Sequence, residues 1–96
     1  MATYISLINW TDKGIASVKE SPARADAARA LAKKLGGDLK HLFMTMGGYD
    51  LVAILELPND EAAARFALMS GAGGSIRTTT LKAFDEASYR KIVGSL

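Results

Sequence analysis

The order of apolar and polar positions divides the chain into strand-like and helix-like segments. Residues 3–9 are rich in β-branched and aromatic side chains, which favours a first strand. A helical turn through Ile15 and Val18 comes next. Ser21-Pro22 then predicts a longer helix, with Ser21 as its N-cap, that ends at Leu35 before two glycines.

The helix over 21–35 has one apolar stripe, formed by Ala25, Ala28, Leu31, Ala32 and Leu35. Its basic residues lie largely off this stripe, and we expect all of them to be solvated: Arg24, Arg29, Lys33 and Lys34.

Two apolar stretches, 39–46 and 51–57, meet at Gly47-Gly48, which predicts a β-hairpin. A loop over 47–49 sets Lys40 opposite Glu56, so we expect this register. Both faces of the hairpin are then apolar. One carries Leu42, Met44, Val52 and Ile54, and the other carries Phe43, Leu51, Ala53 and Leu55.

The rest of the chain predicts a helix, a strand and a last helix. Asn59 or Asp60 caps a helix from 61 to about 70. The inward side of that helix is expected to comprise Ala63, Phe66, Ala67 and Met69. A strand follows over 75–84, and Asp85 caps a helix from 86 to about 93.

This order, β-α-β-β-α-β-α, predicts one α+β domain over residues 1–96. It matches the ferredoxin-like βαββαβ plan, a four-stranded antiparallel sheet, with an additional C-terminal helix. The helices shelter only one face of such a sheet, and a bare apolar second face is unusual in a monomer. We therefore expect a homodimer or higher homo-oligomer through the open face.

Composition excludes several classes of function. The net charge of +2 is too small to indicate binding to nucleic acid or to an acidic membrane. The absence of cysteine excludes disulfides, thiolate metal sites and a cysteine nucleophile. The first residues do not resemble a signal peptide, and no stretch is long enough to span a membrane, so we expect a cytoplasmic location.

No set of side chains forms a catalytic constellation or a metal site, and no cofactor is indicated. His41 is the single histidine, and its expected role is structural. If a pocket lies over the sheet, its polar lining is predicted to be Tyr4, Ser6, Trp10, Tyr49, Asp50, Arg77 and Thr79. Asp50 has a simpler alternative role, which is to accept hydrogen bonds from nearby amides in the turn. Arg77 has one as well, an ion pair at an edge or between subunits.

Four ordered blocks resemble the GYD domain family: residues 10–15, 21–27, 45–52 and 77–81, the third containing Gly48-Tyr49-Asp50. The resemblance implies a small bacterial or archaeal protein of the dimeric α/β-barrel superfamily, in which two ferredoxin-like sheets pack face to face. The resemblance does not imply any particular molecular activity.

Three hypotheses on function remain open. The first is a non-enzymatic homo-oligomeric module that binds a small molecule over the sheet. The second is a cofactor-free oxygenase or isomerase acting on a small apolar or aromatic substrate, by analogy of fold. The third is a signalling subunit that docks on a partner protein through its helices.

Overall fold

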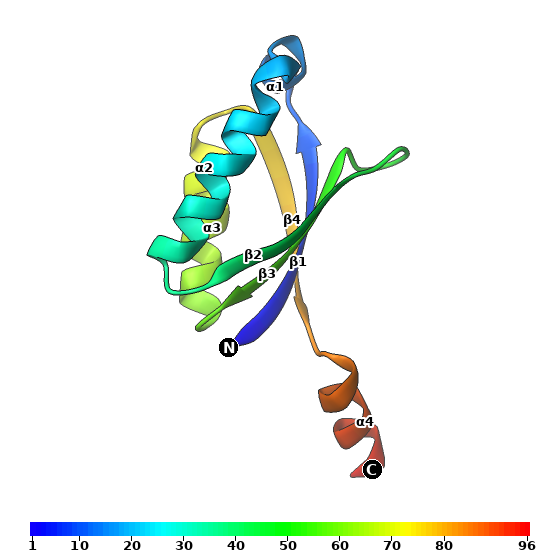
Figure 1. The fold of residues 1–96 in the computed structure, drawn as a ribbon. Coiled ribbons are helices and arrows are strands. Elements are labelled where there is room, and N and C mark those ends of the chain that lie inside the picture. The colour runs from blue at the N-terminus through cyan, green and yellow to red at the C-terminus, as the bar shows by residue number, and fades with distance from the viewer.

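The computed structural model describes residues 1–96 and confirms the predicted order of elements (Figure 1). The strands are β1 (Ala2–Trp10), β2 (Asp38–Met44), β3 (Leu51–Leu57) and β4 (Ile76–Ala83). The helices are α1 (Asp12–Ala16), α2 (Ser21–Lys34), α3 (Asp60–Ala72) and α4 (Glu86–Gly94), with a 3₁₀ turn over Val18–Glu20.

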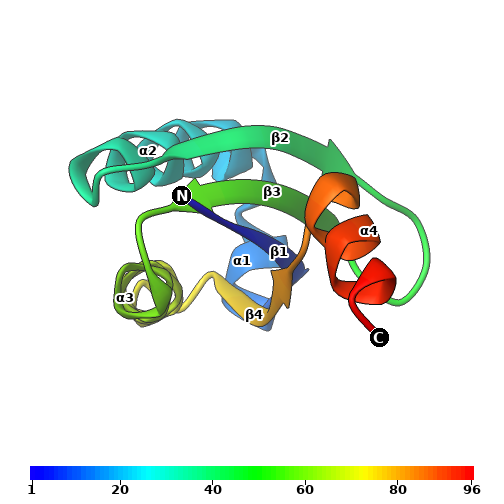
Figure 2. The ribbon, with the colours of Figure 1, turned by 90° about the horizontal axis from the view of Figure 1, so that it is seen from below.

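The strands form one antiparallel sheet in the order β2-β3-β1-β4, which is the ferredoxin-like order. In both ribbon views α2 and α3 lie on the same side of the sheet, and α4 lies off the other side (Figures 1 and 2). We call the side without α2 and α3 the open face. No helix combines the length and the apolar composition that crossing a bilayer requires.

The core lies between the sheet and the two helices. From the sheet it takes alternate residues of the central strands, Tyr4 and Ile8 on β1 and Ala53, Leu55 and Leu57 on β3. The helices contribute Ala32, Ala62, Ala63 and Phe66. Because alternate residues of a strand point to opposite faces, the odd-numbered residues of β1 and the even-numbered residues of β3 lie on the open face.

The predicted hairpin register is wrong by one residue. Met44 lies opposite Leu51 and Leu42 opposite Ala53, so the expected pairing of Lys40 with Glu56 does not occur. A β-bulge at Lys40 shifts the register again, and Glu56 pairs with Asp38. The bulge lets both Leu39 and Leu42 face the helices although three positions separate them. Both faces of the sheet are still apolar, with a changed distribution of residues.

Two of the three predicted helix caps are confirmed. Asn59 Oδ1 accepts from the Ala62 amide at 2.9 Å, and Asp85 Oδ1 accepts from the Ser88 amide at 2.8 Å. Ser21 is not a cap: α2 begins at Ser21 itself, directly after the 3₁₀ turn, whose Val18 carbonyl accepts from the Ser21 amide. The predicted inward position of Met69 is also wrong, because this side chain is half exposed on α3.

The Gly48-Tyr49-Asp50 turn is tied to β1 by hydrogen bonds. Asp50 Oδ2 accepts from the Trp10 amide at 2.9 Å, and the Asp50 amide donates to the Ile8 carbonyl at 2.9 Å. Asn9 Nδ2 donates to the Gly48 carbonyl at 3.0 Å. These bonds join residues about 40 positions apart, so the turn fixes the end of the hairpin against the first strand. This agrees with the structural role considered for Asp50.

We predict that Asp50→Ala lowers the free energy of unfolding by about 1–2 kcal/mol, because the Trp10 amide loses its acceptor. Asp50→Asn keeps an acceptor oxygen at the same place and is the control, with a smaller loss expected. Urea unfolding followed through the fluorescence of Trp10, the single tryptophan, measures both. Equal stability of Asp50→Ala and the parent chain would contradict the structural role.

Gly14 and Gly71 differ in the space around them, and substituting each by alanine tests how closely α1 packs on the rest of the chain. A Cβ on Gly14 would overlap the backbone carbonyl of Ser75, whereas a Cβ on Gly71 would meet open space. We expect Gly14→Ala to cost about 1–3 kcal/mol of stability. Gly71→Ala should be neutral or stabilise by about 0.5 kcal/mol, because alanine favours a helix over glycine. The same unfolding assay checks both, and a stable Gly14→Ala variant would show that α1 is not packed as described.

Candidate functional site

A cavity of about 60 Å³ lies inside the domain, between the sheet and helices α2 and α3. Most of its lining is apolar, contributed by Ile8, Ala25, Ala28, Leu39, Leu42, Leu51, Ala53, Phe66 and Ile76. The polar lining consists of Ser6, Ser21, Arg24, Ser70 and Thr78. An apolar chamber with a few polar groups is the usual composition of a small-molecule site.

The hydroxyl of Ser70 is a polar group in this cavity that lacks a hydrogen bond. Its Oγ is buried and has no hydrogen-bond partner in the chain. Leaving a buried hydroxyl unpaired costs about 1–3 kcal/mol. Ser6 is also buried, on β1 across the cavity. A molecule in the cavity that offers a hydrogen-bonding group would recover the free energy lost at Ser70.

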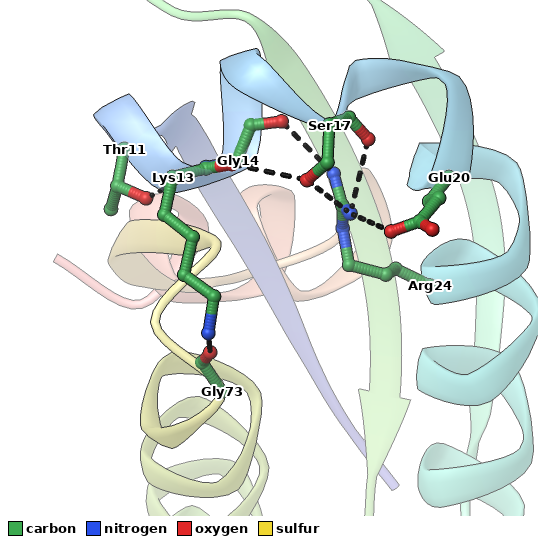
Figure 3. Close-up of polar contacts among 7 residues, drawn as sticks. All are labelled: Thr11, Lys13, Gly14, Ser17, Glu20, Arg24 and Gly73. Carbon is green, nitrogen blue, oxygen red and sulfur yellow. Dashed lines mark hydrogen bonds and ion pairs between the residues drawn. The ribbon is translucent and has the colours of Figure 1, made fainter.

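Arg24 lies at the end of the cavity nearest α1, contrary to the prediction that it is solvated. Its Nη2 donates to the Gly14 carbonyl at 3.2 Å, and its Nη1 lies 3.4 Å from both the carbonyl and the Oγ of Ser17 (Figure 3). Glu20 Oε2 lies 3.9 Å from Nη1. The α1 segment therefore draws the guanidinium inward by surrounding it with oxygen atoms.

The α1 segment is itself held against the connection between α3 and β4. Lys13 Nζ donates to the Gly73 carbonyl at 3.0 Å (Figure 3), and the Thr11 amide donates to the Ser75 carbonyl at 3.1 Å. Thr11 Oγ1 also accepts from the Gly14 amide at 3.1 Å. At this end of the cavity the α1 segment thus joins the start of α2 to the connection between α3 and β4, which is distant in the sequence.

A groove between α2 and α3 borders the cavity. The groove has a volume of about 250 Å³ and is lined by Ala27, Leu31, Met69 and Gly73 together with four residues that also line the cavity, Arg24, Ala28, Ser70 and Ile76. The shared residues lie between the groove and the cavity, and the partly exposed Met69 side chain lines the groove.

The structure brings only one of the seven predicted pocket residues, Ser6, to the cavity. Tyr4 lies on the same face of β1, where its hydroxyl donates to Asp60 Oδ1 at 2.5 Å beside Lys82. Burial, assisted by Asp60, raises the pKa of Tyr4 to about 12. The Tyr4 and Lys82 bonds hold the pKa of Asp60 below its ordinary value. This cluster ties β1 and β4 to the start of α3.

The other five predicted residues lie elsewhere. Trp10 ends β1, and its indole Nε1 is buried without a partner. Tyr49 and Asp50 belong to the hairpin turn, while Arg77 and Thr79 pair with Asn9 and Leu7 and lie exposed on the open face. Arg77 makes no ion pair within the chain. His41 is also on the open face, where its ring stacks on Phe43 with centroids 6.2 Å apart.

Sequence reasoning missed four polar residues of the cavity: Ser21, Arg24, Ser70 and Thr78. A signal existed for Thr78, because strand alternation places it on the face opposite Arg77. In the sequence Ser21 resembles a cap and Arg24 resembles a solvated side chain. No pattern marks Ser70, since a serine in the last turn of a helix is ordinary.

The chemistry available in the cavity is limited to hydrogen bonding and one cation. Its lining has four hydroxyl groups and one guanidinium, and it has no carboxylate, imidazole or amine. No group of three or more histidine, cysteine or acidic residues could hold a metal ion anywhere in the chain. The arrangement is suited to holding a small molecule in place.

Comparisons with known proteins agree with this fold. The crystal structure of TTHA0845 from Thermus thermophilus superposes with a TM-score of 0.56 at 24% sequence identity, covering 88% of this chain and 94% of that one. At this identity the likeness concerns the fold alone. A search of curated proteins found no match. The sequence profile of the GYD domain matches residues 4–93, nearly the whole length, and the chain therefore belongs to the GYD domain family.

Proposed function

We propose that this protein is a homodimeric binding module that holds a small molecule between its sheet and its helices. The observation that supports this most directly is the apolar cavity in which the buried Ser70 Oγ lacks a hydrogen-bond partner. A ligand with a compact apolar body and one hydroxyl, carbonyl or carboxylate group would match both features. The groove between α2 and α3 would admit it and could hold a longer tail.

Binding suits the cavity better than catalysis does. A cofactor-free oxygenase or isomerase needs a group that takes or gives a proton near neutral pH. The single charged side chain of the lining is Arg24, whose guanidinium donates hydrogen bonds and offers no acceptor atom to take a proton. The hydroxyls of Ser6, Ser70 and Thr78 position a ligand without activating it.

The homodimer is proposed from the open face of the sheet. Two rows of residues cross it, each with three apolar members: Ile54, Ile5 and Leu81 lie beside His41 in one, and Phe43, Val52 and Leu7 lie beside Thr79 in the other. Phe43 is 55% exposed and Leu81 is 45% exposed. A continuous apolar patch of this kind marks an interaction surface. A second copy of the chain presents the same patch, so face-to-face packing covers both copies at once.

We predict that the cavity binds at least one of four probes (phenol, indole, 1-hexanol and hexanoate) with a Kd below about 1 mM. Amide NMR shifts should concentrate at Ser6, Ala28 and Ser70, which line it. Ala28→Leu fills the cavity and should weaken binding about tenfold or more. The matched control is Ala30→Leu, on an exposed position of the same helix. If no probe shifts these amides, or if Ala28→Leu binds unchanged, the binding proposal fails.

We predict further that the chain sediments at twice its mass of 10.2 kDa at micromolar concentration. Ile54→Lys places a charge in the centre of the open face and should give a folded monomer, because a buried unpaired ammonium is costly. Ala30→Lys adds the same charge on the helical side and should remain dimeric. A monomeric parent chain, or a dimeric Ile54→Lys variant, would argue against an interface on the open face.

A further inference from the structure

Helix α4 is amphipathic, and its apolar side is exposed. Tyr89, Ile92 and Val93 lie on one face of α4, and Leu96 follows two residues after the helix ends; these four side chains are 47 to 98% exposed. Ser88, Arg90 and Lys91 lie away from this stripe, and Glu86 lies at its edge, one turn before Tyr89. None of the nine residues of α4 is buried. We call the four apolar residues the α4 stripe.

A helix of this length is not stable in water by itself. Isolated helices shorter than about 12–15 residues are marginal, and α4 has nine. The Asp85 cap and the Glu86–Arg90 ion pair at 2.8 Å stabilise the helical conformation of α4. An exposed pair of this kind contributes only about 0.3–0.5 kcal/mol, however. A helix with an uncovered apolar stripe therefore needs a surface to pack against.

The surface area of the chain is consistent with a missing partner. The accessible surface is 6367 Å². A compact monomer of the same mass would expose about 5,300 Å². The excess is similar to the area of about 800 Å² that each subunit buries in a typical stable interface. The Cα radius of gyration agrees: it is 14.2 Å, whereas about 12.5 Å is expected for a compact domain of this length.

The position of α4 favours a second copy as the partner. In both ribbon views α4 extends beyond the end of β4, on the side of the sheet opposite α2 and α3 (Figures 1 and 2). A second copy that approached the open face would therefore meet the α4 stripe as well. A net charge of +2 opposes such association only weakly.

We infer that α4 is an arm that packs its apolar stripe on the second copy of the chain, alongside the paired open faces. The inference rests on the proposed homodimer and adds a reciprocal exchange to it. Two-fold symmetry lets each copy give one arm and receive one, so both stripes are buried in a closed dimer.

The test compares two variants of the full chain by sedimentation and by dilution. Tyr89→Ser, Ile92→Ser and Val93→Ser together remove most of the stripe, and Lys91→Ser is the matched control on the polar side of α4. We expect the triple variant to raise the dimer Kd about tenfold or more, and the control to change it less than about twofold. Trp10 fluorescence verifies that the body stays folded, and probe binding in the cavity should persist.

Hydrogen exchange of the α4 amides in the parent chain identifies which chain covers the stripe. Protection that rises with the dimer fraction supports the exchanged arm. Equal protection in the monomer at high dilution would show that α4 folds back on its own sheet, which overturns the inference. A triple variant that dimerises as tightly as the parent also overturns it, and leaves the open-face dimer standing. A parent chain that is monomeric at all concentrations overturns both.

Discussion

The structure depends on a sheet whose central strands are apolar on both sides. β1 and β3 turn Tyr4, Ile8, Ala53, Leu55 and Leu57 toward the helices, and Ile5, Leu7, Val52 and Ile54 toward the open face. The hydrophobic effect favours removing both sets from water. The chain has two helices for this purpose, and both lie on the same side (Figure 2). The helices of one chain thus cover one of the two apolar faces of the sheet. The proposed dimer would cover the other face, which belongs to the same strands.

The covered side of the sheet is packed incompletely, and that incompleteness creates the candidate site. Small residues line the cavity from both walls, Ala28 on α2 and Ala53 on β3, so the helices and the sheet do not fill the space between them. Protein interiors are normally close-packed, and a void costs stability. Arg24 and Ser70 place polar groups at the edge of this void. The proposed binding role would account for both features together.

The sequence was sufficient for the elements, their order and the two-faced sheet, because these depend on local patterns. Period-two alternation in β1 and β3, and the caps at Asn59 and Asp85, each act within a few residues. The register of the hairpin was mispredicted because the turn pairs Thr45 with Asp50, whose amide and carboxylate are bonded to β1, a contact between segments distant in the sequence. The bulge at Lys40 adds a second shift that has no local signature.

The candidate site was harder to predict because its residues are brought together by tertiary contacts. Arg24 looks like a solvated helix residue until the α1 segment presents the Gly14 and Ser17 carbonyls to it. The position of Ser6 in the cavity follows from strand alternation. Ser70 stands out only in the structure, because its buried Oγ has no hydrogen-bond partner. Tyr49 and Asp50 are polar and belong to the turn, and Asp50 holds that turn against β1 by accepting from the Trp10 amide, 40 positions away in the sequence.

The central claim is that a second copy covers the open face. Isotope-filtered NMR on a mixture of ¹³C-methyl-labelled and unlabelled chains tests it most directly. We expect intermolecular NOEs from the methyl groups of Ile5, Val52 and Ile54 to protons of the unlabelled chain. Methyl groups on this face that show no intermolecular NOE, and instead respond fully to a paramagnetic agent dissolved in the solvent, would contradict it.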